Sequence, residues 1–308
     1  MNYQNNYQNL LEHIYTDIAP YIGEGVAASY IPELARVPTN KFGMALHTID
    51  GEIYTVGDAE EAFSIQSISK LFTLTLALKQ HGQSLWQRVG REPSGNAFNS
   101  LVQLEYEQGI PRNPFINAGA LVITDLLCSS YNDAKSRVLD FISLLSDNEE
   151  LTFNKAVAAS ELEHGHRNRA MGNFLKSFDN IRNNVDEVIQ AYFHHCSITM
   201  NCVELAQACH YLINSGRLIN SSTNILSQRE TKYINALMMT CGTYDAAGEF
   251  AYRVGLPCKS GVGGGIVAVM PGQFSVCVWS PGLDANGNSL VGLKALDSLT
   301  TKTGVSIF

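Results

Sequence analysis

The stretch that decides how this chain folds is Phe63-Ser64-Ile65-Gln66-Ser67-Ile68-Ser69-Lys70-Leu71-Phe72, which continues as a mostly apolar run to Leu78. The run predicts a helix near 65–80 with apolar residues on nearly every face, so this helix has to be buried at the centre of the protein. Ser67 and Lys70 share one face of it, within reach of a direct hydrogen bond. A serine needs a neighbouring base to act as a nucleophile, and a buried lysine, whose pKa is lowered, can be that base. We therefore interpret the pair as nucleophile and base, against the alternative of a helix-capping serine and a surface lysine.

A second motif lies near the other end of the chain, in Lys259-Ser260-Gly261-Val262-Gly263-Gly264-Gly265. Its glycines allow a ligand to approach the backbone closely, and Lys259 and Ser260 suit a site for an anion or a carbonyl group. A serine three residues before a lysine, followed much later by Lys-Ser-Gly, resembles the serine β-lactamases and penicillin-binding proteins. Ser146-Asp147-Asn148 matches the third motif of those enzymes. It lies in a polar stretch just after a predicted helix, so we interpret it as a loop.

Strand patterns occur at both ends of the chain, and helical patterns fill the middle. Strands are expected at 42–47, 53–56, 250–254, 266–270 and 274–279, the first two joined by a hairpin turn at Asp50-Gly51. Helices are expected at 10–18, 65–80, 117–128, 135–145, 185–195, 201–213, 229–239 and 290–301.

This order predicts an α+β fold of the β-lactamase and penicillin-binding type. An antiparallel sheet is built from both chain ends and flanked by helices, and an all-helical lobe is inserted between its strands. No repeat or low-complexity linker marks a boundary, so residues 1–308 are expected to form a single domain. Its sheet lobe covers about 1–65 and 242–308, and its helical lobe about 66–241.

Composition narrows the class of protein. The chain has 308 residues, of which 45% are hydrophobic and 16% charged, as in a compact enzyme. A formal net charge of −8 argues against nucleic acid or an anionic membrane as the main partner. The 7 cysteines form no Cys-x-x-Cys pair and are interpreted as reduced thiols. With neither a signal peptide nor a spanning segment of about 18 apolar residues in view, a cytoplasmic location is expected.

The residues around the two motifs resemble the serine-dependent glutaminase family, from about Tyr30 to Gly287. The segments that carry the resemblance are Tyr30-Ile31-Pro32-Glu33-Leu34, Gln66-Ser67 with Lys70, Glu92-Pro93-Ser94-Gly95, Asn113-Pro114-Phe115-Ile116-Asn117-Ala118-Gly119-Ala120, Ser160-Glu161 with Arg167-Asn168, Tyr192 before Cys196-Ser197-Ile198, Cys241-Gly242-Thr243-Tyr244-Asp245 and Gly255-Leu256-Pro257-Cys258-Lys259-Ser260-Gly261-Val262.

The resemblance implies a β-lactamase-like fold and hydrolysis of L-glutamine to L-glutamate and ammonia, without a cofactor or a metal. It implies a homo-oligomer, either a dimer or a tetramer. Carried over by position, Ser67 is the nucleophile and Lys70 its base. The substrate pocket is expected to consist of Tyr30, Gln66, Ser67, Asn117, Glu161, Asn168, Tyr192, Tyr244 and Val262.

The chemistry of glutamine agrees with these residue types. Its α-ammonium needs a carboxylate such as Glu161, and its α-carboxylate needs neutral donors such as Asn117 and Tyr30. The backbone N–H groups of Ser67 and Val262 would form the oxyanion hole. Tyr244 would protonate the leaving nitrogen, with Lys259 in support.

Two other functions stay open on the sequence alone: a β-lactamase-like hydrolase of another amide, and a non-catalytic binding protein. The histidines at 164, 166, 194 and 195 invite a metal hypothesis, but no cysteine or carboxylate completes a site with metal-ligand spacing. His166 also stands where related sequences carry an acidic residue.

Overall fold

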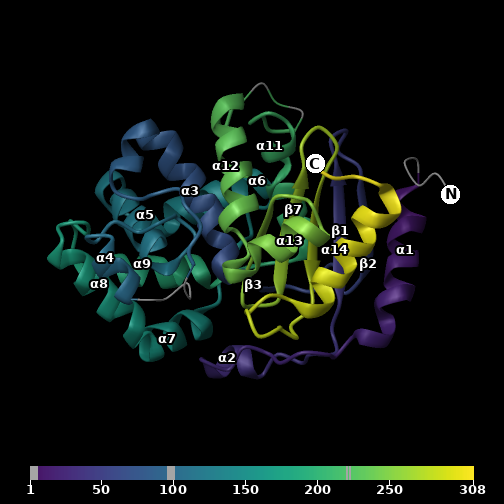
Figure 1. The fold of residues 1–308 in the computed structure, drawn as a ribbon, viewed down its shortest axis with the longest axis horizontal. Helices are drawn as coiled ribbons and strands as arrows, with labels where there is room; N and C mark the ends of the chain where they lie inside the picture. Colours follow the sequence, from purple (N-terminus) through teal and green to yellow (C-terminus); the bar gives the residue numbers. More distant parts are fainter. Residues whose placement is uncertain (1–5, 96–100, 220, 222) are drawn as a thin grey trace.

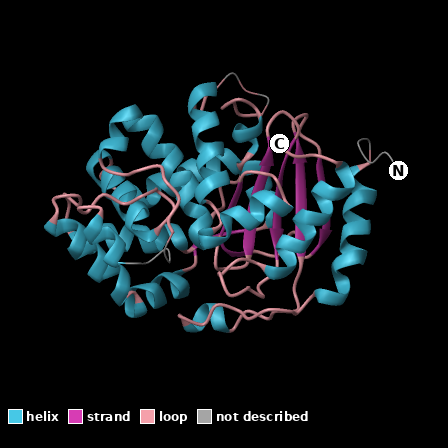
Figure 2. Ribbon diagram, viewed as in Figure 1, coloured by secondary structure: helices cyan, strands magenta, loops and turns pink. Residues whose placement is uncertain are grey.

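The computed structural model describes residues 6–95, 101–219, 221 and 223–308. One part of the molecule is built around an antiparallel sheet and the other is helical (Figure 1). The two ends of the chain both lie on the sheet side, while the middle of the chain makes the helical side (Figure 2). The fold is therefore α+β, with a sheet made from segments near both chain ends.

The sheet has 5 strands in the order β2-β1-β8-β7-β6, and each pair of neighbouring strands is antiparallel. The strands are β1 (Gly43–Thr48), β2 (Ile53–Gly57), β6 (Cys258–Ser260), β7 (Gly265–Met270) and β8 (Phe274–Trp279). The expected hairpin and the expected strands at 266–270 and 274–279 are confirmed. Pairing of β1 with β8, for example Met44 with Val278, joins the two ends of the chain.

Helices from the two chain ends cover one face of the sheet (Figure 1). They are α1 (Tyr7–Ile18), which is followed by a 3₁₀ turn at Ala19–Tyr21, α13 (Ala247–Arg253) and α14 (Leu290–Thr303). Strand residues with alternate spacing, such as Met44 and Leu46, point into this layer. The first and last helices were both expected from their apolar spacing.

The expectation of a strand at 250–254 is wrong, because this segment belongs to helix α13. Phe250 and Val254 are buried, while Tyr252 is 88% exposed. Residues two apart share a face in a strand, whereas residues four apart share a face in a helix. The missing strand is β6, which is too short to show an alternating pattern.

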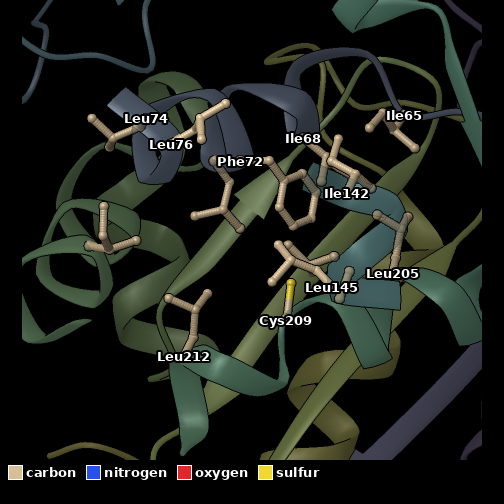
Figure 3. Packing of buried hydrophobic residues seen from close by; sticks show 14 of the residues in the cluster. Ile65, Ile68, Phe72, Leu74, Leu76, Ile142, Leu145, Leu205, Cys209 and Leu212 are labelled. Atoms are coloured by element: carbon tan, nitrogen blue, oxygen red, sulfur yellow. The ribbon is translucent and has the colours of Figure 1, made fainter. Parts of the chain in front are cut away.

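The opposite face of the sheet packs against the central helix α3 (Ser69–His81) and its neighbours (Figure 3). Every residue of α3 from Ser69 to Leu78 is buried, as its apolar composition predicts. The neighbours are α6 (Ala134–Ser146), α10 (Cys202–Ala208), α11 (His210–Ile213) and α12 (Gln228–Cys241). The helix expected at 201–213 is therefore divided into two, at Cys209.

The helical part contains α5 (Asn117–Ser130), α7 (Lys155–His164), α8 (His166–Ser177) and α9 (Val185–Cys196). Two short helices, α2 (Pro32–Ala35) and α4 (Leu101–Tyr106), also lie apart from the sheet. An all-helical lobe was expected, and this expectation is wrong in one respect. Three short strands form a second sheet there, in the order β3-β5-β4. These strands are β3 (Phe63–Ser64), β4 (Thr152–Phe153) and β5 (Ile198–Met200). With only two or three residues each, they show no pattern in the sequence.

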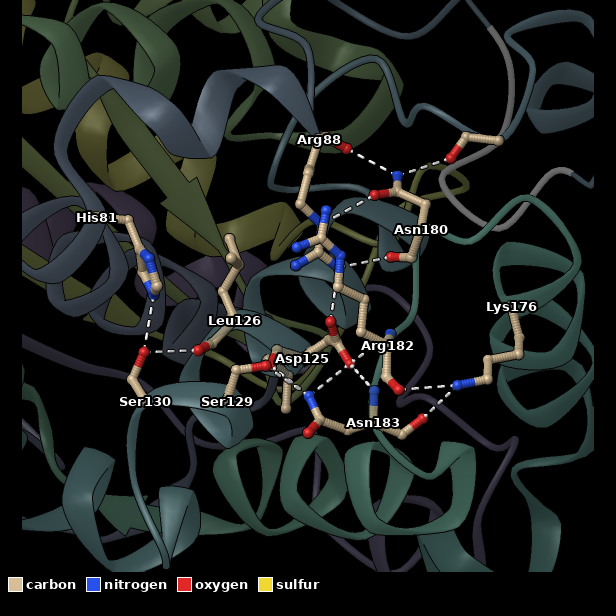
Figure 4. A network of polar contacts seen from close by, with 12 residues as sticks. His81, Arg88, Asp125, Leu126, Ser129, Ser130, Lys176, Asn180, Arg182 and Asn183 are labelled. Atoms are coloured by element: carbon tan, nitrogen blue, oxygen red, sulfur yellow. Dashed lines mark hydrogen bonds and ion pairs between the residues drawn. The ribbon is translucent and has the colours of Figure 1, made fainter.

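A buried ion pair joins α5 to the loop that follows α3 (Figure 4). Arg88 donates to the carboxylate of Asp125 over 2.6 Å, and the side chain of Asp125 is fully buried. The other carboxylate oxygen accepts from the backbone N–H groups of Arg182 and Asn183, at 3.0 and 2.8 Å. Asn180 in turn accepts from Arg88 through its side-chain and backbone oxygens. This network fixes the helix that begins at Asn117.

Replacing Asp125 by alanine should lower the free energy of unfolding by about 3–5 kcal/mol, because it leaves the guanidinium of Arg88 buried without a counter-charge. Urea denaturation followed by circular dichroism measures this. Asp140→Ala, at an exposed position of α6, is the matched control and should change the value by no more than about 0.5 kcal/mol. Equal losses in the two variants would contradict the assignment of Asp125 as an anchor.

Candidate active site

Ser67 lies in a tight turn between the small sheet and the central helix. The turn is a 3₁₀ segment, Gln66–Ile68, directly before α3, and Gln66 has a φ of +48°. A non-glycine residue in this region is uncommon and holds the backbone in a costly conformation. Ser67 is 8% exposed and opens onto a cavity of about 360 Å³. The sequence predicts this serine at the start of a helix, whereas the structure places it in the 3₁₀ turn just before the helix begins at Ser69.

The glycine-rich loop packs directly on the turn that carries Ser67. A Cβ added to Gly261 would lie 2.5 Å from the Ile65 oxygen, and one added to Gly263 would lie 2.4 Å from the Ser64 oxygen. Only glycine fits at these two positions without a backbone shift. Their packing brings Val262, between them, to the wall of the same cavity.

Lys70 is buried beside Ser67 at the first turn of α3. Its Nζ donates to Asn117 Oδ1 over 2.7 Å and to the Phe115 carbonyl over 3.2 Å. Neither of these two bonds goes to Ser67. Burial lowers the pKa of Lys70 to about 8. About a tenth of this amine is therefore neutral at pH 7, far more than for an ordinary lysine, and the neutral form is the one that a general base requires.

Lys259 and Tyr244 lie behind the nucleophile. Lys259 Nζ donates to the backbone oxygens of Gly242 and Ser260, and burial together with the nearby Lys70 lowers its pKa well below the ordinary value. Burial raises the pKa of Tyr244, while hydrogen bonds with the Ser67 side chain and the Val262 backbone lower it. The Tyr244 phenol therefore stays protonated at neutral pH, and its hydroxyl, close to Ser67, donates over 3.4 Å to the Ser260 carbonyl oxygen.

A buried carboxylate occupies another wall of the cavity. Glu161 is 3% exposed, and burial raises its pKa. Its Oε1 accepts a 2.6 Å hydrogen bond from the Tyr30 hydroxyl, which also donates to Gln66 Oε1 over 3.2 Å. Since the partner of this carboxylate is a neutral hydroxyl, Glu161 can meet a cationic group of a ligand.

Neutral amides lie between this carboxylate and Lys70. Asn117 Nδ2 donates to Asn168 Oδ1 over 3.0 Å, while Asn117 Oδ1 accepts from Lys70 and, over 3.4 Å, from the Tyr192 hydroxyl. Asn117 thus connects the buried lysine to the residues that line the cavity.

The cavity brings together eight of the predicted site residues, which are Tyr30, Gln66, Ser67, Asn117, Glu161, Asn168, Tyr192 and Val262. Tyr244 was expected to line it, but its side chain lies behind Ser67 and is not part of the cavity wall. The sequence interpretation missed His164, Gly165, Arg167 and Cys196, which also line it. Three of these lie between Glu161 and Asn168, and Cys196 lies one helical turn after Tyr192. Their closeness in the chain to predicted site residues was the signal that could have identified them as part of the cavity wall.

The remaining sequence hypotheses fall outside this cavity. Ser146 ends α6 and Asp147 caps it with a φ of +52°, so the loop interpretation of this motif is confirmed. His166 begins α8 with an exposed side chain and does not line the cavity. Among the described residues, no three His, Cys, Asp or Glu side chains gather as a metal site would need. No helix in the described ranges is both long and apolar enough to cross a membrane.

Comparison with known proteins shows the family of this chain. The glutaminase family model matches residues 25–308. A glutaminase of Ralstonia nicotianae is 59% identical over 303 residues, which cover 98% of this chain and 100% of the relative. A solved structure described as "Probable glutaminase ybaS" has a TM-score of 0.93 and 36% identity, over 99% of this chain and 98% of that one. A structure of Mglu in its glutamate form has a TM-score of 0.92 and 32% identity, over 98% of this chain and 69% of that one. The chain therefore belongs to the glutaminase family (EC 3.5.1.2).

Proposed function

We propose that this chain hydrolyses L-glutamine to L-glutamate and ammonia through a glutamyl ester on Ser67, with Lys70 as general base. The observation that carries the proposal is one cavity that holds a serine beside a lysine of lowered pKa and, on another wall, a buried carboxylate. Mglu, the structural neighbour at 32% identity, is described in its glutamate form, which supports a pocket for this product.

In the first half of the reaction, neutral Lys70 takes the proton of Ser67 as Oγ attacks the side-chain carbonyl carbon of glutamine. The oxyanion that forms is held by the backbone N–H groups of Ser67 and Val262. Loss of one such donor typically costs on the order of 100-fold in rate. When the C–N bond breaks, Tyr244 gives its proton to the nitrogen, which leaves as ammonia, and Lys70 returns a proton to Tyr244.

In the second half, water attacks the ester and the same groups carry the protons back. Lys70 accepts the proton of the water, and Ser67 leaves as a hydroxyl when glutamate is released. Lys259 packs over the ring of Tyr244 and helps to hold it in place, since its Nζ lies 5.1 Å from the centre of that ring. Every proton in this scheme moves between water, the substrate and these side chains.

The head group of glutamine determines where the side-chain amide lies. Glu161 is proposed to bind the α-ammonium, which replaces the Tyr30 hydroxyl on this carboxylate, and Tyr30, Asn117 and Asn168 then donate to the α-carboxylate. Gln66 and Tyr192 complete the wall between the two. Asparagine has a shorter side chain, so its amide cannot reach Ser67 while its ammonium is held at Glu161.

The type of fold, the number of domains and the oligomeric state are proposed as well. The antiparallel sheet with its central serine–lysine helix supports a β-lactamase-like fold. A single domain is proposed, with a sheet lobe and an inserted helical lobe. A homo-oligomer, dimer or tetramer, is proposed from the family resemblance, and a cytoplasmic location is proposed from the free cysteines.

Replacing Glu161 by glutamine tests the substrate assignment, because it keeps the shape of the side chain and removes its charge. The KM for L-glutamine should rise at least about 30-fold, since a buried charge-assisted hydrogen bond to the α-ammonium is worth about 2–5 kcal/mol. The fall in kcat should be much smaller. Ammonia release at varied glutamine concentration measures both. Glu163→Gln, at an exposed position two residues along α7, is the matched control.

The unmodified protein supplies the test against other substrates. Ammonia release from L-asparagine should be far slower than from L-glutamine, and a chromogenic cephalosporin, which has no α-ammonium for Glu161, should stay intact. Rapid opening of the cephalosporin, or equal rates with both amino acids, would overturn the proposed substrate.

A further inference from the structure

The segment 284–289 lies next to two residues of the site, Val262 and Tyr244, and does not line the substrate cavity. Gly287 has a φ of +86°, and a Cβ placed on it would lie 3.7 Å from Val262 Cγ1 and 3.8 Å from Tyr244 Cε2. A side chain at position 287 would therefore contact both residues. Nothing in the sequence motifs around Ser67 or Lys259 points to it.

Within this segment, Asn288 is fully buried and held from two sides. Its backbone N–H donates to Asp284 Oδ1 over 3.0 Å, and its backbone oxygen accepts from the N–H of Asp284 over 2.8 Å. Ser289, the next residue, caps α14. Asn288 is thus anchored in the sheet part of the molecule, independently of the helices that hold Lys70 and Glu161.

The side chain of Asn288 reaches the peptide directly before Tyr244. Its Nδ2 donates to the Thr243 carbonyl oxygen over 3.2 Å. The orientation of the amide follows from this contact, because a carbonyl oxygen can only accept. The same oxygen also accepts from the N–H of Ala246. The Thr243–Tyr244 peptide is therefore held by two donors.

Tyr244 needs such support, because its backbone is in an unfavourable conformation. Its φ is +56°, in the left-handed region that a bulky side chain rarely adopts. A backbone of this kind persists only where the surrounding structure holds it in place. If the peptide before Tyr244 turned back toward an ordinary φ, the phenol would leave Ser67.

We propose that Asn288 is a positioning residue for the reaction: it holds the Thr243 carbonyl and thereby keeps the Tyr244 hydroxyl at the Ser260 carbonyl, beside Ser67. This inference rests on the proposed function, in which Tyr244 protonates the leaving nitrogen. Asn288 touches neither substrate nor reacting atoms, so its effect passes through Tyr244. A displacement of about 1 Å at a reacting group is enough to cost on the order of 100-fold in rate.

The test is a double-mutant cycle on kcat for L-glutamine with Asn288→Ala, Tyr244→Phe and the variant that combines them. Asn288→Ala alone should lower kcat about 10- to 100-fold and change KM less than about 3-fold, because Glu161, Tyr30 and Asn168 lie on other elements. In the Tyr244→Phe background, the same substitution should cost less than about 3-fold. Asn286→Ala, exposed on the same turn, is the matched control and should keep the rate of the unmodified protein.

If the alanine variant does not fold, Asn288→Asp can replace it, because it keeps the shape of the side chain and still removes the donor to the Thr243 carbonyl. As its carboxyl group ionises, the donor to Thr243 is lost and only an acceptor remains, so kcat relative to the unmodified protein should fall as the pH rises. Near-ultraviolet circular dichroism at each pH shows that the folded fraction is unchanged.

The outcomes separate this inference from the proposed function. If Asn288→Ala lowers kcat by the same factor in both backgrounds, the positioning role is wrong and the role of Tyr244 stands. A large rise in KM with kcat unchanged also overturns it. If Tyr244→Phe turns over at the full rate, then both the acid role of Tyr244 and the role of Asn288 are wrong.

Discussion

Replacing Ser67 by alanine should lower the rate of ammonia release from L-glutamine at least about a thousandfold, because the proposed glutamyl ester forms on its Oγ. The residual rate would come from the oxyanion hole and from substrate binding. The variant should fold and bind glutamine as before, since the substitution removes a single hydroxyl at the wall of the cavity. Enzyme-coupled detection of ammonia and calorimetric titration with glutamine measure the two quantities.

The matched control is Ser84→Ala, in the 3₁₀ segment Gly82–Gln87 that follows α3. Its hydroxyl donates to the His81 backbone oxygen at the protein surface, so the substitution should leave the rate unchanged. Turnover that survives in Ser67→Ala would mean that water attacks glutamine directly, and the covalent step would have to be abandoned.

Replacing Lys70 by methionine should lower kcat about 100- to 10,000-fold, because it removes the base while keeping an unbranched side chain in the buried space. The same role predicts how the unmodified enzyme depends on pH. Only the neutral amine can accept a proton, and burial lowers the pKa of Lys70 to about 8. Below this pH the neutral fraction falls tenfold per unit, so kcat/KM should rise with pH and level off above about 8.

A pH series of kcat/KM, with the denaturation of the protein followed at each pH, measures this profile. Lys79→Met, near the exposed end of the same helix, is the control and should show the profile of the unmodified protein. Lys70→Arg should be as inactive as Lys70→Met, since a guanidinium stays charged. A profile that falls between pH 6 and 8 would show that protonated Lys70 is the active form, and would contradict its role as base.

The sequence predicts those parts of the site that lie close together along the chain. Ser67 and Lys70 follow from their spacing in a predicted helix that is apolar on nearly every face. The pairing of Tyr30 with Glu161 joins residues 131 positions apart, and no periodicity of a single chain encodes such a contact. These residues were named through the family resemblance, and the cavity shows where they meet. Asn288 was missed because an isolated asparagine in a turn has the same signature whether or not it supports a catalytic group.

The fold shows the same limit. Segments with a clear period, such as 274–279, were predicted residue by residue as strands. The segment 250–254 was wrongly predicted, because aromatic and β-branched residues favour strands by composition while their burial follows a helix. The strands of the second sheet are two or three residues long, and they exist only because tertiary contacts place them side by side.

The pairing of β1 with β8 has a consequence for how the protein is made. The partners Met44 and Val278 are separated by roughly 230 residues, so β1 leaves the ribosome long before its neighbour exists. At about 5–20 residues per second, the wait is roughly 10 to 50 seconds. During this time the β1–β2 hairpin presents an open, apolar edge to the cell, which is a hazard for aggregation. We therefore expect the nascent chain to depend more on protection from aggregation at the ribosome than the folded protein does.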